Sequence, residues 1–209
     1  MPGANGKPRP AGPGSVWLLL CLVWMTAAPA PAQTPPAERL TTIAGLRALS
    51  ATDAARGLPV EIRGQITYYE RRWDTLFIQD STSGCYVYSS GRPRPEMQAG
   101  QMVTVRGRTR LGGGPAAAHA IQEEEIIPEG GLVPFPAPAR PGFNELAAGR
   151  ADSLWIEVEG VVRVIWSDRD RFEIDLMLDG GRVRCYLPRP AGAPLPQELL
   201  HARVRARGA

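Results

Sequence analysis

Two segments of the chain have nearly the same sequence although they lie far apart. Residues 60–67 read Val-Glu-Ile-Arg-Gly-Gln-Ile-Thr, and residues 156–163 read Ile-Glu-Val-Glu-Gly-Val-Val-Arg. Each is followed by a charged, aromatic turn and then by a short Phe-x-x-Asp segment, Phe77–Asp80 in the first copy and Phe172–Asp175 in the second. An internal repeat at a nearly constant offset indicates that one small module was used twice, so the fold must contain two similar units.

The first copy predicts five β-strands. Alternation of apolar and polar residues places them at Val60–Tyr69, Thr75–Gln79, Gly84–Tyr88, Gln101–Arg108 and around Ala117–Ile127. The long first strand carries Gly64 in its middle, where glycine usually marks a bulge or a sharp bend, and Gly160 occupies the same place in the second copy. A long bent strand followed by four more is the pattern of a five-stranded OB barrel. We therefore expect an all-β protein with two tandem OB-fold-like barrels.

The second copy stops after its fourth strand. Residues 103–107 match residues 204–208, but nothing after them corresponds to 121–127. We expect the second barrel to lack its last strand and the chain to be the front part of a longer protein. Short helices are predicted before each barrel, at 43–49 and 143–146. The expected organisation is a signal peptide at 1–32, a disordered mature N-terminus at 33–39, a helix and first barrel at 40–132, a proline-rich linker at 133–141, and a helix and truncated second barrel at 142–209.

The N-terminus has the features of a secretory signal peptide. Lys7 and Arg9 precede the apolar run Val16–Met25, and Ala30-Pro31-Ala32 is a small-x-small cleavage site. The run is shorter than the roughly 20 apolar residues of a membrane span, so an uncleaved anchor is the less favoured interpretation. The mature chain is expected to be periplasmic or extracellular. We expect no transmembrane segment beyond the signal peptide in this chain, and a membrane tether only if the natural protein is longer.

The mature charge is close to balanced. Lys7 is the only lysine, and removal of Lys7 and Arg9 from the 24 basic residues leaves 22 arginines against 21 acids. Proteins that bind nucleic acids normally carry a marked basic excess on one face, so the charge argues against a nucleic-acid partner. A small ligand or a protein partner is expected instead. The two mature cysteines, Cys85 and Cys185, fall on the core faces of separate strands, which favours free buried thiols over a disulfide or a metal site.

The mature sequence resembles the exported N-terminal OB-like regions of bacterial membrane-bound sensor histidine kinases. The resemblance is carried by segments of both copies: 40–50, 54–60, 63–64, 67–69, Trp73, 76–80 and 152–162. It implies an extracytoplasmic input module. The given sequence contains no histidine-phosphorylation segment and no ATP-binding motif, so kinase activity is not transferred with the resemblance.

One candidate ligand site follows from the OB pattern, because OB barrels bind ligands on strands 2 and 3 and through the loops between strands 1–2 and 4–5. The first loop and its neighbours combine aromatic rings with guanidinium groups, which stack on rings and hold anions. The candidate residues are Tyr69, Arg71, Arg72, Trp73 and Tyr88. In the alternative interpretation Trp73 covers one end of the barrel, and the arginines pair with Glu70 and Asp74.

Other conspicuous residues have structural interpretations. Gly112–Gly114 lacks the lysine and the following helix of a phosphate loop, so a flexible hairpin is expected. Glu123–Glu125 is expected on a solvated edge, and Asp80 and Asp175 are expected at the start of turns. No catalytic residues, metal ligands or cofactors are predicted. The sequence favours a non-catalytic exported interaction or ligand-sensing module; the alternative is a secreted binder of oligosaccharide or single-stranded nucleic acid.

Overall fold

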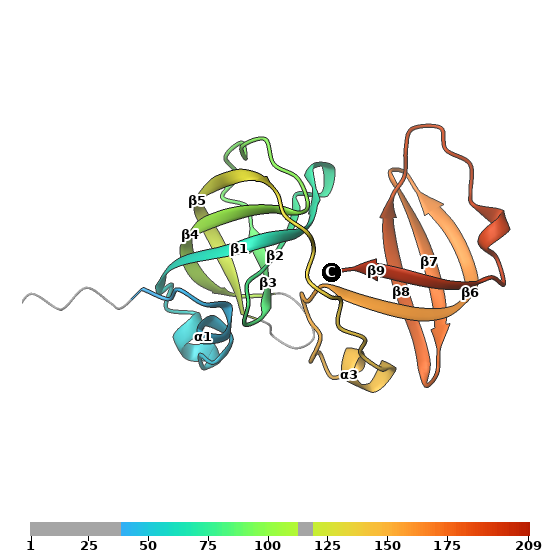
Figure 1. Cartoon of the computed structure of the whole chain (residues 1–209), viewed down its shortest axis with the longest axis horizontal. Coiled ribbons are helices and arrows are strands. Elements are labelled where there is room, and N and C mark those ends of the chain that lie inside the picture. Colours follow the sequence, from blue (N-terminus) through green and yellow to red (C-terminus); the bar gives the residue numbers. More distant parts are fainter. Residues whose placement is uncertain (1–38, 113–118) are drawn as a thin grey trace, which may run out of the picture. The chain divides into compact units, whose positions relative to one another are not determined.

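The computed structural model describes residues 39–112 and 119–209, and its strands form two separate sheets (Figure 1). The predicted signal peptide, almost all of the predicted disordered N-terminus and most of the glycine loop lie outside the described residues. The first sheet is a closed five-stranded barrel in the order β1-β2-β3-β5-β4. Its strands are β1 (Pro59–Glu70), β2 (Thr75–Gln79), β3 (Gly84–Tyr88), β4 (Gln101–Leu111) and β5 (His119–Leu132).

The barrel closes because β1 pairs along its first half with β4 and along its second half with β2. The last junction is short: β3 and β5 run parallel and pair only at Val87–Ile121 and Tyr88–Gln122. Inside, the alternate residues of all five strands form one apolar core whose members are almost fully buried. The predicted OB-like barrel is confirmed, and β2 and β3 have the predicted bounds.

The second sheet has four strands in the order β8-β7-β6-β9. They are β6 (Ile156–Asp168), β7 (Arg171–Leu178), β8 (Gly181–Pro188) and β9 (Arg203–Gly208). This order equals that of the barrel with the counterpart of β5 left out. The prediction of a second module without its last strand is therefore confirmed for the residues that the structure describes. Few of its apolar side chains are buried, and Val158, Val162 and Leu176 are among them.

The two modules share their backbone irregularities as well as their strand order. The β1–β2 register shifts between Ile66 and Tyr68, and the β6–β7 register shifts between Val162 and Val164, at the same distance after the repeat glycine. The glycines themselves are needed for close approach, because a Cβ on Gly64 would lie 3.0 Å from the Gln79 carbonyl oxygen. On Gly160 it would lie 2.8 Å from that of Met177. The bulge thus lies just after each glycine rather than on it.

The Phe-x-x-Asp part of the sequence repeat is not structurally equivalent. Strand pairing aligns Phe77 with Asp175, because Phe77 faces Tyr68 on β1 while Asp175 faces Val164 on β6. Asp175 also does not begin a turn as expected: it lies within β7 and its side chain is only 1% exposed, between Arg182 and Arg184. The turns before β2 and β7 differ in length, and the two Phe-x-x-Asp segments therefore occupy different places in their strands although their offset in the sequence is close to that of the glycines.

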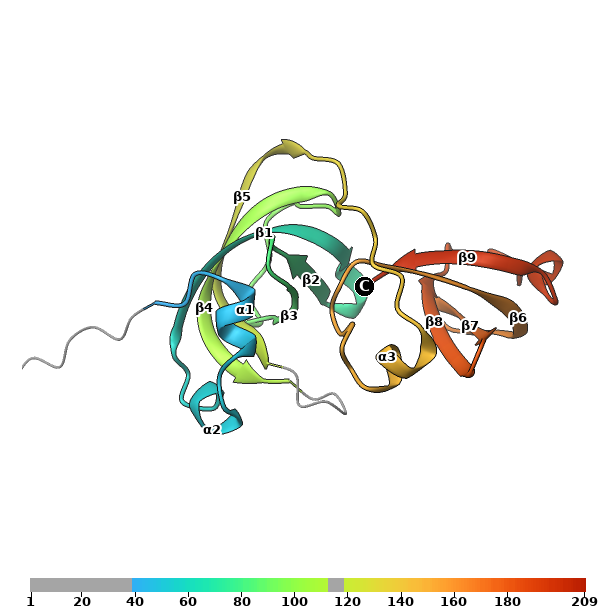
Figure 2. The same cartoon turned by 60° about the horizontal axis from the view of Figure 1, so that its bottom comes forward.

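Two short helices, α1 (Ile43–Arg47) and α2 (Ala51–Ala54), lie at one end of the barrel (Figure 2). Ile43 and Leu46 are fully buried in the barrel core. Asp80 holds α1 in place, since its Oδ2 accepts from the Ile43 amide at 2.8 Å and its Oδ1 accepts from two amides of its own turn. Although partial burial alone would raise the pKa of Asp80, these bonds and that of the Thr82 hydroxyl lower it. Asp80 therefore begins a turn, as predicted. A third helix, α3 (Phe143–Ala147), precedes β6.

The cysteines and glutamates differ partly from expectation. Both cysteines of the described residues are free; Cys85 is buried as predicted, but Cys185 is partly exposed. Glu124 and Glu125 are exposed and pair with Arg108 and Arg106. The expectation of a solvated edge is wrong for Glu123, whose side chain is 4% exposed, because it shares the inner face of β5 with Ile121. The bulge in the β4–β5 pairing follows Glu123 and lets both Glu124 and Glu125 face outward.

Candidate functional site

The predicted ligand loop is held by its own charges. After β1 the chain forms a single 3₁₀ turn, η1 (Arg71–Trp73), and the Glu70 carboxylate accepts from the Arg72 amide at 3.0 Å and from its guanidinium at 3.2 Å. Arg71 Nη1 lies 3.1 Å from Glu96 rather than near Asp74. Both arginines are exposed and each has an acid beside it, so neither guanidinium is an uncompensated charge that a ligand would have to neutralise.

The other three predicted site residues lie on different surfaces. Trp73 is partly buried, and its Nε1 donates to Asp170 Oδ2 at 2.6 Å. Tyr69 packs against the barrel core. Tyr88 lies on the outer face of β3, with the Arg110 guanidinium 3.9 Å from the centre of its ring. The structure therefore does not bring the five predicted residues together into one site.

A row of aromatic side chains crosses the outer face of β1, β2 and β3. We call Tyr68, Phe77, Tyr86 and Tyr88 the aromatic row. Strand pairing sets Tyr68 beside Phe77 and Phe77 beside Tyr86, at centroid distances of 6.5 and 5.1 Å. Tyr88 follows at 4.6 Å from Tyr86. Adjacent rings meet edge to face, the arrangement that aromatic quadrupoles favour, and every ring is partly exposed.

The row continues beyond Tyr88 toward β4 and β5. Arg110 covers the Tyr88 ring and donates to the Gln122 side-chain oxygen at 2.6 Å. Gln122 in turn donates to the Ser89 carbonyl oxygen at 2.8 Å, which fixes its amide. Beside these two residues lies an open hollow of about 450 Å³. It is lined by Ala55, Gly57, Arg108, Thr109, Arg110, Leu111 and Gln122.

The second module shows that the fold does not require this row. The positions equivalent to Tyr68, Phe77 and Tyr86 are Val164, Asp175 and Arg184, which are paired with one another in the same way across β6, β7 and β8. There an ion pair replaces the rings, with Arg184 Nε 2.9 Å from Asp175. Only Tyr186 keeps an aromatic side chain, in the place of Tyr88. The pairing of these three strands is therefore the same with and without the row.

Tyr68 differs from its neighbours in its hydroxyl group. The oxygen is buried and has no hydrogen-bond partner among the described residues. Burial, with a smaller contribution from the nearby Glu70 carboxylate, raises the pKa of Tyr68 to about 12. Burial also raises the pKa of Tyr86, whose hydroxyl donates a long bond of 3.4 Å to the Asp74 carbonyl oxygen. Both phenols are therefore neutral donors at physiological pH.

The sequence contained a signal for most of the row. Leu76 and Ile78 flank Phe77, and Cys85 and Val87 flank Tyr86, so strand alternation places both aromatic rings on the outer face. Only Tyr88 of the row was among the predicted site residues.

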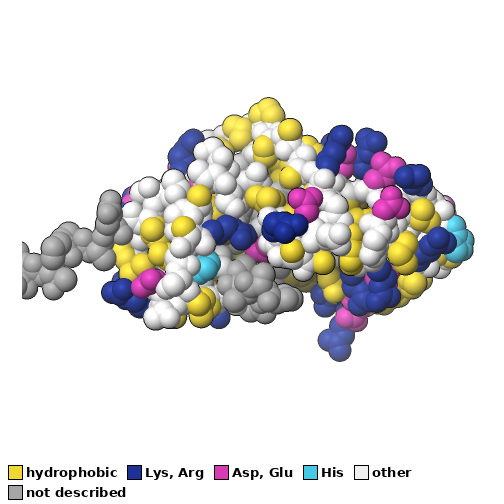
Figure 3. Space-filling view, turned by 90° about the horizontal axis from the view of Figure 1, so that it is seen from below, with side chains coloured by type: hydrophobic (Ala, Val, Ile, Leu, Met, Phe, Trp, Pro, Cys, Tyr) yellow, Lys and Arg dark blue, Asp and Glu magenta, His cyan; other side chains and the backbone are white. Residues whose placement is uncertain are grey.

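Charged side chains of both signs lie on the face of the molecule that Figure 3 shows. Ion pairs join strands throughout both sheets, for example Arg63 with Glu129 and Arg203 with Glu159. Among residues 39–112 and 119–209 there is no group of three or more histidine, cysteine or acidic side chains placed to hold a metal ion.

No protein-family model and no curated protein matches the chain. Among solved structures it is similar to a chain described as the crystal structure of fission yeast Pot1 and ssDNA, with 10% sequence identity over 80% of this chain and 88% of that one. The TM-score is 0.29, which is too low to support an inference about a ligand. No helix of the described residues is both long enough and apolar enough to cross a membrane.

Proposed function

We propose that the chain is a non-catalytic exported binding module that recognises a ring-containing ligand on the aromatic row of its first barrel. The observation that carries the proposal is the internal comparison of the two modules. Equivalent strand positions hold three aromatic side chains in one module and Val164, Asp175 and Arg184 in the other. Because the equivalent strands of the second module pair in the same register without three of these rings, strand pairing alone does not account for the row. The row also lies on the face that OB barrels use for ligands.

The chemistry of the row favours an uncharged or weakly charged ring, and we propose a saccharide as the ligand class. Partly exposed tyrosines offer apolar ring surface together with neutral hydroxyls, and Arg110 and Gln122 add polar donors at the end of the row. The arginines of the nearby loop already have acidic partners, Glu70 and Glu96. A polymer of phosphates would need several uncompensated basic side chains along its path.

The resemblance to input regions of sensor histidine kinases supports a sensing role for this binding. In that role the module would stand outside the cytoplasm and report ligand occupancy to a partner, without chemistry of its own. The signal-peptide features of the N-terminus support the same location.

The proposal is tested by titrating the protein with gluco-, manno- and chito-oligosaccharides and with short oligothymidine, following tyrosine and tryptophan fluorescence and heat. We expect saturable binding of one saccharide class, with affinity lowered about tenfold or more in Tyr86→Ala and in Tyr88→Ala, since removing a ring that the ligand covers loses apolar burial of about 1.5–3 kcal/mol. Tyr186→Ala is the matched control, because Tyr186 is the counterpart of Tyr88 in the second module.

Two results would contradict the proposal. One is equal loss of binding in Tyr186→Ala and Tyr88→Ala. The other is salt-sensitive binding of oligothymidine without any saccharide binding, which would assign the row to single-stranded nucleic acid instead.

A further inference from the structure

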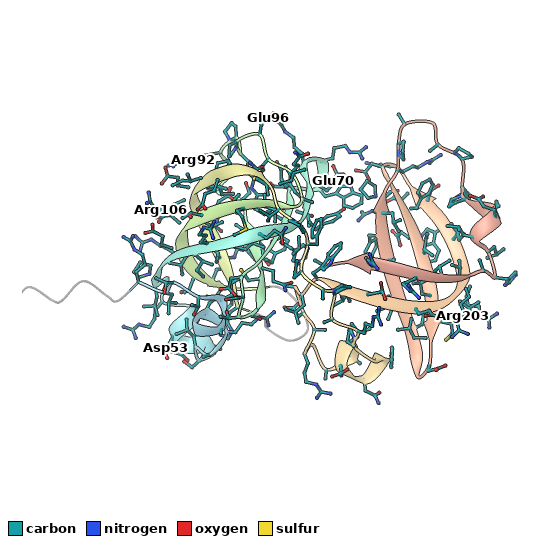
Figure 4. All side chains as sticks on the ribbon, viewed as in Figure 1. Asp53, Glu70, Arg92, Glu96, Arg106 and Arg203 are labelled. Atoms are coloured by element: carbon teal, nitrogen blue, oxygen red, sulfur yellow. The ribbon has the colours of Figure 1, made fainter. Side chains whose placement is uncertain are left out.

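Arg110 is the one arginine of the barrel strands that has no acidic partner among the described residues. The others are Arg63 on β1 and Arg106 and Arg108 on β4, and each lies within ion-pair distance of a glutamate. Figure 4 labels Arg106, whose side chain extends outward from the barrel. The sequence of residues 112–118, which join β4 to β5, contains no acidic residue and therefore cannot supply a partner for Arg110.

The residue of β5 that meets Arg110 is the neutral Gln122. Two residues earlier on β4, Arg108 lies 2.8 Å from the Glu124 carboxylate of β5. Arg110 instead uses its Nη1 to donate to the Gln122 side-chain oxygen at 2.6 Å. An amide oxygen accepts this hydrogen bond as a carboxylate oxygen would, but it carries no negative charge. The guanidinium is therefore held in place while its charge stays uncompensated.

The Arg110 guanidinium is fixed on two sides. Its central carbon lies 3.9 Å from the centre of the Tyr88 ring. Gln122, which accepts from Nη1, is itself anchored, because its Nε2 donates to the Ser89 carbonyl oxygen at 2.8 Å. In the described part of the chain no acceptor is bonded to the Nε or the Nη2 of Arg110. These two N–H groups form the planar fork that binds a carboxylate through two parallel hydrogen bonds.

An open hollow lies beside Arg110, at the end of the aromatic row. Arg110 and Gln122 both line it, and its volume is about 450 Å³. Sites for small molecules have volumes of about 300–1,000 Å³, so the hollow is large enough for part of a ligand. A ligand whose rings cover Tyr86 and Tyr88 therefore has room to place a substituent against Arg110.

From these observations we propose that the ligand is an acidic saccharide whose carboxylate is bound by Arg110. The inference rests on the proposed function, because it takes the aromatic row as the surface that holds the sugar rings. Gln122 is a positioning residue in this site, since it orients the guanidinium without neutralising it. A single uncompensated guanidinium suits the one carboxylate of a hexuronic acid residue, and not the closely spaced charges of a polymer of phosphates.

The test compares acidic saccharides with their neutral methyl esters, which keep the sugar ring and remove the charge. The whole protein is titrated by calorimetry with trimers of galacturonic, glucuronic and mannuronic acid and with the methyl ester of each. We expect at least one acid to bind about tenfold more tightly than its ester, because hydrogen bonds between charged groups are about twice as strong as those between neutral groups. This comparison uses the unaltered protein and does not depend on the folding of a variant.

Two variants locate the preference at Arg110. Arg110→Gln removes the positive charge, and Gln122→Glu supplies an acid of the kind that Arg108 already has. In each variant we expect the acid to bind about tenfold more weakly and the ester to stay within about twofold of its wild-type affinity. Partial unfolding would weaken both ligands together and leave their ratio unchanged. Arg63→Gln is the matched control, because Arg63 is paired with Glu129 and lies outside the row and the hollow, and it should keep the wild-type ratio.

The outcomes separate this inference from the proposed function. If acid and ester bind the wild type equally and Tyr86→Ala weakens both, the row binds sugars but Arg110 recognises no carboxylate, and only the inference is overturned. It is also overturned if the preference for the acid survives in Arg110→Gln, because another group then binds the carboxylate. If no saccharide of either set binds, or if Tyr86→Ala leaves the affinity for the acids unchanged, the proposed function is wrong and the inference falls with it.

Discussion

At the scale of single residues, Tyr68 is the member of the aromatic row whose polar group is least well accommodated. Its hydroxyl is buried without a hydrogen-bond partner in the described residues, and such a group costs roughly 1–3 kcal/mol of desolvation. We therefore expect Tyr68→Phe to leave the free energy of unfolding unchanged or to raise it by up to about 1 kcal/mol. Tyr86→Phe is the matched control and should lower it slightly, because the Tyr86 hydroxyl donates to the Asp74 carbonyl oxygen. Urea unfolding at neutral pH measures both.

The pH dependence of Tyr68→Phe gives an independent check. The pKa of Tyr68 is raised to about 12 in the folded protein, above its ordinary value near 10. Between these values the unfolded chain releases the proton and the folded chain keeps it, so stability falls as pH rises through that window. The wild type should lose more stability there than Tyr68→Phe. Identical slopes would show that the hydroxyl is solvated.

Tyr69 shows why the predicted site differed from the structural one. Unbroken alternation from the buried Ile66 would place Tyr69 outside and Tyr68 inside. The register shift between Ile66 and Tyr68 adds one residue to β1 and reverses this order, so Tyr69 packs on the core and Tyr68 lies in the row. Glycine at position 64 indicated an irregularity, but not on which side of it the phase changes.

At the scale of elements, the weakest junction of the barrel is the one between β3 and β5, which pair at only two positions. Arg94 reinforces it. Its Nη2 donates to the Val87 carbonyl oxygen on β3 at 3.0 Å, and its Nε lies 2.9 Å from the Glu123 carboxylate on β5. Both side chains are only 4% exposed. The ion pair therefore links the two strands where main-chain bonds are few.

Removing one partner should have a large effect, because it leaves the other charge buried and unpaired. We expect Arg94→Met to lower the free energy of unfolding by about 3–5 kcal/mol. Arg106→Met removes a guanidinium that lies between Glu61 and Glu125 on the exposed outer face and should cost about 1 kcal/mol or less. Chemical denaturation of both variants makes the comparison. A similar small loss in both would mean that the β3–β5 junction holds without Arg94.

The presence of a strand was predictable where apolar and polar residues alternate strongly, as in β2 and β3. The burial of Glu123 was not predictable, since three successive glutamates give no sign of which one turns inward. That choice depends on which residue of β5 shares the inner face with Ile121 and on Arg94, a residue from a loop distant in sequence. Likewise, the apparent Phe-x-x-Asp repeat misaligned β2 with β7, because local similarity does not report the length of the preceding turn.

At the scale of the whole molecule, the described chain consists of one closed barrel and one open sheet with very different cores. The barrel buries a large set of apolar side chains completely, including Ile62, Ile66 and Leu76, whereas the second module has few fully buried ones. The number of strands and the repeat were predictable from sequence. The incomplete burial of the second module's inner side chains was not predictable, because Val204 and Val103 lie in similar sequence segments. It depends on how the strands are assembled into each sheet.

This difference predicts an order of unfolding. Because local stability follows buried apolar contact, amides of β8 and β9 should exchange through openings of lower free energy than amides of β1 and β4. We expect hydrogen exchange under native conditions to show that the amides of the second module lose protection first as urea is raised, while those of the barrel stay protected.

Two substitutions, Ala206→Val and Val105→Ala, test the difference in burial between the two modules. The first adds apolar volume to a partly exposed position and should change protection in the second module only slightly. The second removes methyl groups from a fully buried position and should cost the barrel about 1–3 kcal/mol. Equal protection of both modules, with one cooperative transition for all amides, would mean that the open sheet is as stable as the closed barrel.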